Sequence, residues 1–149
     1  MKTKKFGKIY TYSLLVVFLF IAIISCNKNP YNRLLGTWEN PKYSGETYIY
    51  DGITFTSSGS YKMKVKSIIW SSDASGIIYG RYITNSFYTN VVGKYYAVSF
   101  KDLTYSSVSI SGAYKEKGKI AADSLVEAIT EFTINNGYYG TYSSCKKVK

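Results

Sequence analysis

Side chains able to carry out catalytic chemistry are few in this chain. It contains nine acidic residues, two cysteines and no histidine. Serine–histidine and cysteine–histidine nucleophile pairs are therefore excluded, and so are the usual zinc sites. The acids are scattered, without a pattern that indicates paired glycosidase carboxylates. Neither a phosphate-binding glycine loop nor a dinucleotide fingerprint is present. The sequence therefore predicts a protein that is not an enzyme and that has no cofactor and no metal site.

The two cysteines, Cys26 and Cys145, lie in very different surroundings. Four lysines fall within the first eight residues, and the run Leu14–Ile24 is apolar throughout. A helix of that run rises about 16 Å, which is about half the hydrocarbon thickness of a bilayer. A basic start, a short apolar run and a small residue before the cut are typical of a secretory signal peptide. Ser25 is that small residue, and Cys26 follows it directly.

The segment Ile23-Ile24-Ser25-Cys26 resembles the lipobox of bacterial lipoproteins. In that family the cysteine thiol receives a diacylglycerol, the signal is cut just before the cysteine, and the new amino terminus is acylated, as with palmitate. The resemblance implies a signal peptide at 1–25, lipidation of Cys26 and a lipidated tether at 26–32. Two or three acyl chains hold a protein firmly on a membrane. The alternative is an uncleaved anchor helix that extends backwards through 9–13.

The lipobox resemblance also implies a location in the cell envelope, outside the cytoplasm. Asn27 follows the cysteine, where family members kept at the inner membrane often carry aspartate. If the cell has two membranes, the outer one is favoured. Without residues 1–25, 15 basic residues remain against nine acids, a net charge of +6. This charge favours anionic lipid heads, acidic glycans or acidic proteins as partners, and it is equally typical of a solvated surface.

Residues 33–149 are expected to form one β-rich domain. The clearest strand begins at Tyr61, where Tyr61, Met63 and Val65 alternate with lysines. Period two places the apolar side chains on one face and the lysines on the other, which is typical of an antiparallel sheet. Segment 121–132 fits either a short helix capped by Asp123 that gives way to a strand near Glu131, which is favoured, or a strand throughout. Further strands are expected at 36–39, 49–56 with a kink at 51–52, 77–84, 91–100, 108–114 and 138–148.

The predicted fold is all-β, a small antiparallel up-and-down barrel of about eight strands with at most one short helix. A barrel is favoured over a sandwich because closure removes exposed strand edges. The segments 34–38 (LLGTW) and 53–61 (ITFTSSGSY) resemble the start of the lipocalin-like domains of bacterial lipoproteins. The resemblance implies a calycin barrel whose mouth holds a small apolar molecule. In lipocalins the tryptophan packs under an arginine near the last strand, where this chain has Lys146 and Lys147.

The sequence is compatible with two different functions. The first is a carrier that binds or sequesters a small apolar or amphipathic ligand. The alternative is a surface interaction or adhesion protein that binds a macromolecular partner through an exposed tyrosine-rich sheet face. Nucleic acid is not expected as a partner, because no aromatic residue interleaves with the lysines at 62–66. Cys145 is expected to be buried.

The candidate residues for each function are as follows. The side chains that line a ligand cavity, or else fill a solid core, are Trp38, Phe55, Tyr61, Met63 and Trp70. The tyrosines of the alternative are Tyr43, Tyr48, Tyr50, Tyr95, Tyr96, Tyr138 and Tyr139.

Overall fold

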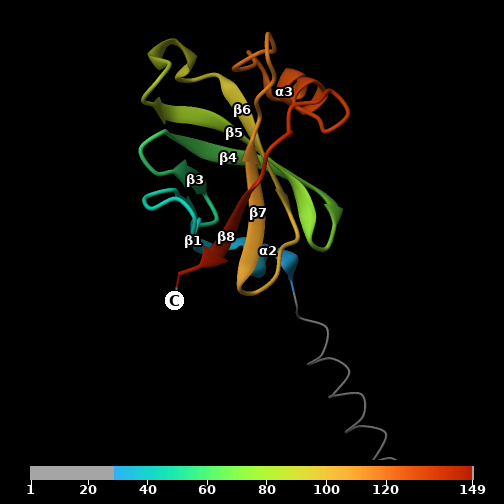
Figure 1. Ribbon diagram of the computed structural model, residues 1–149. Coiled ribbons are helices and arrows are strands. Elements are labelled where there is room, and N and C mark those ends of the chain that lie inside the picture. The colour runs from blue at the N-terminus through green and yellow to red at the C-terminus, as the bar shows by residue number, and fades with distance from the viewer. Residues whose placement is uncertain (1–28, 149) are drawn as a thin grey trace, which may run out of the picture. The chain divides into compact units, whose positions relative to one another are not determined.

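A closed β-barrel is the main feature of the computed structural model, which describes residues 29–148 (Figure 1). Eight antiparallel strands pair in sequence order, and β8 returns to pair with β1. This arrangement confirms the predicted all-β, up-and-down barrel. The strands are β1 (Gly36–Glu39), β2 (Thr47–Tyr50), β3 (Thr54–Ser57), β4 (Tyr61–Ser72), β5 (Ser75–Asn85), β6 (Tyr95–Lys101), β7 (Ser107–Gly112) and β8 (Ser143–Lys147).

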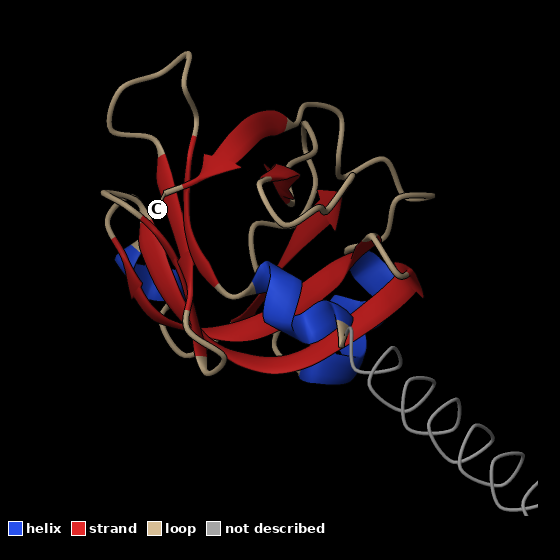
Figure 2. Cartoon of the chain, turned by 90° about the horizontal axis from the view of Figure 1, so that it is seen from below, coloured by secondary structure: helices blue, strands red, loops and turns tan. Residues whose placement is uncertain are grey.

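In the described part of the chain, three short helical segments accompany these strands. They are α2 (Pro30–Leu34), the 3-10 turn η1 (Thr89–Val91) and α3 (Leu125–Glu131). The compact unit that contains the barrel begins at Arg33. Seen from below, its strands curve around a common interior (Figure 2). Within residues 29–148, every helix is too short or too polar to cross a lipid bilayer.

Strand β4 shows why the strands have one buried and one exposed face. Met63 is completely buried and Lys64 is exposed, as the alternation in sequence predicts. Val65 pairs with Gly80, and the next pair along joins Ser67 to Tyr79, so Lys66 is the extra residue of a β-bulge. A bulge bends the strand and increases its twist, which helps a sheet to close.

The predicted strand at 49–56 is wrong, because the chain reverses there between β2 and β3. Asp51 Oδ1 accepts hydrogen bonds from Ile53 N at 2.8 Å and Thr54 N at 2.6 Å. Gly52 has a φ of +93°, a backbone conformation that glycine adopts without strain. Aspartate followed by glycine therefore makes a tight turn here, where a kink was expected.

The segment 121–132 contains a helix, as favoured, although its cap differs from the one expected. Ser124 is the N-cap of α3, and its side chain accepts a hydrogen bond from Glu127 N. The chain does not become a strand after α3: residues 133–142 lack strand structure, and β8 begins only at Ser143. The predicted strands at 91–100 and 138–148 are therefore both too long at their starts.

The barrel interior is filled at one end by a large apolar cluster. Its buried side chains come from all eight strands and from neighbouring segments. Cys145 on β8 belongs to it and is only 2% exposed, which confirms the expected burial. The largest fully buried members are Leu34, Trp38, Phe55, Met63, Ile78, Phe100, Leu103 and Ile110.

Trp38 closes this end of the barrel together with a lysine from the last strand. Trp38 and Lys147 are opposite one another in the β1–β8 pair, and Lys147 Nζ lies 4.8 Å from the centre of the indole ring. The ammonium group also donates a hydrogen bond to Arg33 O at 3.2 Å, and Trp38 Nε1 donates to Leu34 O at 3.0 Å. Lys147 therefore covers the indole ring of Trp38 from the neighbouring strand. A cation over an indole ring is a stabilising contact.

A second cluster lies between α3 and the outer wall of β5 and β6. Ala128 and Phe132 from the α3 region pack there with Tyr79 and Ala97. The hydroxyls of Tyr79 and Tyr139 both donate to Phe132 O. Tyr79 is therefore buried although its side chain is on the outer face of β5.

Candidate ligand-binding site

The barrel wall has an opening between β7 and the segment that leads into β8. The two strands pair only as far as Ile110 and Ser143. Beyond that pair the two segments separate, and they meet again where Tyr114 N donates to Tyr138 O at 2.9 Å. A cavity of about 400 Å³ lies at this opening. Its volume is in the range of small-molecule sites. The lining includes Tyr48, Ile110, Gly112, Tyr138, Thr141 and Ser143.

A hydrogen-bonded carboxylate lies next to this cavity. Tyr48 Oη donates to Glu46 Oε1 at 2.6 Å, Asn40 Nδ2 donates to Glu46 Oε2 at 2.6 Å, and Ser143 Oγ also donates to Glu46 Oε1. Burial by itself raises the pKa of Glu46, but the hydrogen bonds from these three donors outweigh it and hold that pKa below its ordinary value of 4.5. Glu46 is therefore ionised at neutral pH.

Three tyrosines from β4, β5 and β6 form an aromatic group inside the barrel. The rings of Tyr82 and Tyr96 are stacked with their centres 5.1 Å apart. Tyr61 meets both edge-on, at 5.6 Å from Tyr82 and 5.4 Å from Tyr96. These are favourable aromatic geometries, so the three rings hold one another in place.

Gly112 on β7 provides the space that two of these hydroxyl groups occupy. A Cβ atom at residue 112 would lie 2.7 Å from Tyr96 Oη and 3.7 Å from Tyr61 Oη. Gly112 lines the cavity whereas Tyr61 and Tyr96 do not, so the two hydroxyls lie next to a cavity-lining residue. A side chain at this position would displace the Tyr96 hydroxyl.

The hydroxyls of Tyr61 and Tyr96 are neutral and available for hydrogen bonding. Burial, followed by the neighbouring tyrosines, raises the pKa of Tyr61 well above its ordinary value, and burial also raises the pKa of Tyr96. Among residues 29–148 neither hydroxyl has a hydrogen-bond partner. Both side chains are only partly buried, so water can pair with these hydroxyls, and a ligand that reaches them would take the place of that water.

The structure places the five sequence-predicted residues in one cluster. Trp38, Phe55 and Met63 are at most 1% exposed and fill the core. Trp70 packs against that cluster and meets Phe100 edge-on at 4.8 Å. Tyr61 packs against it too, and it alone of the five approaches the cavity wall.

The predicted exposed tyrosine face is wrong for most of its members. Of the seven tyrosines proposed for it, only Tyr43 is exposed, at 66%. The physical reason is the closed barrel: Tyr48, Tyr50 and Tyr96 occupy inward positions of their strands, and Tyr138 and Tyr139 pack in the cluster under α3.

Sequence reasoning missed Glu46, Gly112 and Ser143 as parts of a site. Glu46 is isolated in sequence, and nothing near it indicates that Ser143 comes within hydrogen-bonding distance. Gly112 offered a weak signal, because a glycine late in an apolar strand often marks a close approach by another group.

No protein-family model, curated protein or solved structure matches the chain. Within residues 29–148, no three cysteine or acidic side chains gather in a way that could hold a metal ion. Cys26, the predicted lipidation site, lies outside the described residues, as do the predicted signal peptide and the first three residues of the tether, 26–28.

Proposed function

We propose that this chain is a lipid-anchored bacterial envelope protein whose barrel binds a small amphipathic ligand. The observation that carries the binding proposal is the pair of unpartnered tyrosine hydroxyls beside a cavity of about 400 Å³. The anchor part is supported by the lipobox-like segment that ends at Cys26.

The lining of the cavity favours a particular ligand chemistry. The rings of Tyr48 and Tyr138 and the side chain of Ile110 offer apolar surface. The Tyr61 and Tyr96 hydroxyls can donate or accept, and ionised Glu46 can only accept. A ligand with an apolar body and one or more hydroxyl or amine donors fits this set. Lys115 and Glu116 line the cavity with opposite charges, so the lining does not select a ligand by its net charge.

The binding proposal is tested on the full chain purified from its own membranes in a mild neutral detergent. Native mass spectrometry should detect a small molecule bound to the wild-type barrel. The ligand should be lost or weakened in Gly112→Ala, because the added methyl displaces the Tyr96 hydroxyl. The double variant Tyr61→Phe with Tyr96→Phe should weaken binding about tenfold, since it removes two hydrogen bonds while keeping both rings.

Tyr105→Phe is the matched control, because it removes one hydroxyl from an exposed tyrosine far from the cavity lining. It should bind as the wild type does. A wild-type protein that carries no small molecule, and that also fails to enhance the fluorescence of the probe anilinonaphthalene sulfonate or of its neutral analogue N-phenylnaphthylamine, would contradict the proposal. So would equal binding by the wild type and the double variant.

The anchor is tested separately by intact mass. The mature chain should begin at Cys26 and carry added acyl mass, and Cys26→Ala should abolish both changes. In a cell with two membranes we expect the protein in the outer one. An unmodified chain that still carries Met1 would contradict the anchor without affecting the binding proposal.

A further inference from the structure

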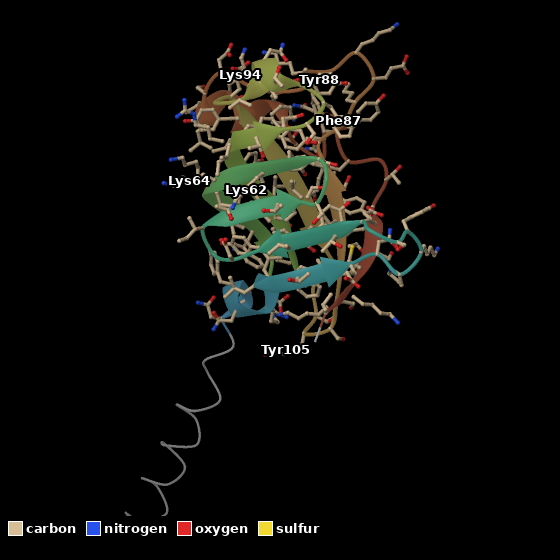
Figure 3. All side chains as sticks on the ribbon, turned by 90° about the vertical axis from the view of Figure 1, so that its left-hand side faces the viewer. Lys62, Lys64, Phe87, Tyr88, Lys94 and Tyr105 are labelled. Carbon is tan, nitrogen blue, oxygen red and sulfur yellow. The ribbon has the colours of Figure 1, made fainter. Side chains whose placement is uncertain are left out.

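A shallow groove lies on the outer wall of the barrel, away from the cavity between β7 and β8. It crosses β4 and β5 and reaches the loop that contains η1, and its volume is about 340 Å³. Its cationic lining consists of Lys64, Lys66 and Arg81, and Ile83 and Val92 add apolar surface. Figure 3 shows Lys64 beside Lys62 on the outside of the barrel.

The cations of this groove have no acidic partners. Within residues 29–148 there are three ion pairs, and none includes Lys64, Lys66 or Arg81. Lys64 and Arg81 are directly opposite one another in the β4–β5 ladder. Like charges in such a cross-strand pair destabilise a sheet. A bound anion would relieve this repulsion.

The geometry of the groove is partly fixed by the η1 loop. Arg81 Nε donates a hydrogen bond to Gly93 O, which holds the guanidinium group against the loop. Its remaining N–H groups are available to an anion. Ile83 and Val92 are 44% and 48% exposed, which leaves an apolar strip beside the three positive charges.

We propose that this groove binds a phosphorylated amphiphile, with the phosphate at Lys64, Lys66 and Arg81 and the apolar part on Ile83 and Val92. Arginine and lysine together are suited to phosphate, because the guanidinium fork bonds two oxygens and the ammonium adds a point charge. The apolar strip distinguishes such a ligand from a free inorganic anion. The ligand can be a lipid headgroup at a membrane surface or a soluble phosphate ester, since both present the same chemistry.

Isothermal titration calorimetry on the full chain in neutral detergent tests the proposal with three probes: hexyl phosphate, inorganic phosphate and hexanol. Hexyl phosphate should bind more tightly than inorganic phosphate, and hexanol should not bind. Lys64→Gln with Arg81→Gln should weaken hexyl phosphate binding about tenfold or more, because charge-assisted hydrogen bonds are lost. Val92→Ser should weaken hexyl phosphate and leave inorganic phosphate unchanged.

Lys42→Gln with Lys117→Gln is the control, since it removes the same charge from exposed positions outside the groove. It should bind hexyl phosphate as the wild type does. Equal losses in the two double variants would overturn the proposal, because net charge alone would then explain binding. Hexyl phosphate and inorganic phosphate binding with equal affinity would overturn the amphiphile assignment.

Two further measurements distinguish a lipid headgroup from a soluble phosphate ester, and the outer groove from the barrel cavity. Flotation with phosphatidylcholine vesicles, with and without phosphatidylglycerol, is measured for the wild type and the Lys64→Gln/Arg81→Gln variant. A phosphatidylglycerol-dependent gain that this variant loses assigns the groove to a lipid headgroup, and hexyl phosphate binding without that gain assigns it to a soluble ester. Gly112→Ala should leave hexyl phosphate binding intact, because Gly112 lies outside the groove. The test of the groove is therefore independent of the test of the barrel cavity.

Discussion

At the scale of single residues, Gly36 explains why a glycine begins the first strand. Its φ is +128°, where other residues are strained. A Cβ atom there would also lie 2.7 Å from Lys147 Cε, the carbon next to the ammonium group that covers Trp38. The Gly-Thr-Trp segment is therefore one structural unit with a lysine more than a hundred residues later. The glycine makes room for the cation, and the cation covers the tryptophan.

Gly36→Ala should lower the free energy of unfolding by about 1–3 kcal/mol, because it adds backbone strain and displaces Lys147. The measurement is urea unfolding of a double-mutant cycle with Lys147→Ala. In the Lys147→Ala background the glycine substitution should cost less, since only the backbone strain remains. Equal costs in both backgrounds would show that Gly36 and Lys147 are not coupled.

At the scale of elements, the β2–β3 turn depends on one ionised side chain. Asp51 Oδ1 accepts from two backbone N–H groups, and Asp51 Oδ2 accepts from Thr54 Oγ1 at 2.7 Å. Hydrogen bonds from Thr54, first its backbone and then its side chain, and from Ile53 N lower the pKa of Asp51 from 3.8 to about 2. The charged form is therefore the one that stabilises the turn.

This pKa shift predicts a pH-dependent effect of Asp51→Asn. Asparagine keeps an acceptor oxygen and removes the charge. Because the folded-state pKa lies below the ordinary value of 3.8, the stability that the charge contributes is complete above that value and is lost as the pH falls towards about 2. In urea unfolding, the variant should be less stable than the wild type at neutral pH, and the difference should shrink with acidification below about pH 4.

Glu116→Gln is the control for this prediction, because it removes one carboxylate from the exposed segment between β7 and α3. Its stability difference from the wild type should not follow the same acid profile. A difference between Asp51→Asn and the wild type that stays constant down to the lowest pH would rule out the charged turn as its source.

At the scale of the whole molecule, Cys145 reports on whether the barrel is closed. It lies on β8, which joins β7 to β1, and its thiol points into the core. Burial, and to a smaller extent the charge of Glu46, raises the pKa of Cys145 to about 11. The thiolate is the reactive form of cysteine. The native thiol is therefore protected because reagents cannot reach it and because it stays protonated.

In a Cys26→Ala background, Cys145 is the one thiol in the chain. We expect its reaction with a disulfide reagent near neutral pH to be at least about a hundredfold slower than that of the unfolded chain, with the rate rising steeply at the urea unfolding transition. Reaction of the native protein at the rate of the unfolded chain would show that β8 separates from its neighbours without global unfolding.

The sequence alone determined the fold class, because the relevant forces are local. Alternation at 61–66 fixes which face of β4 is buried, and turn residues near Gly59 and Gly76 divide the chain into strands. The strand ends were less predictable. Asp51-Gly52 fits either a kink or a hairpin turn, and only the pairing of β2 with β3 distinguishes them.

Only the tertiary structure decided where a ligand could bind. The sequence favoured the large apolar residues Trp38, Phe55 and Met63, which the barrel uses to fill its core. The cavity exists because β8 stops pairing with β7 at Ser143, and that limit depends on contacts between distant segments. The same is true of the tyrosines: propensity predicts that they lie in strands, but the register around a closed barrel decides which of them point inward.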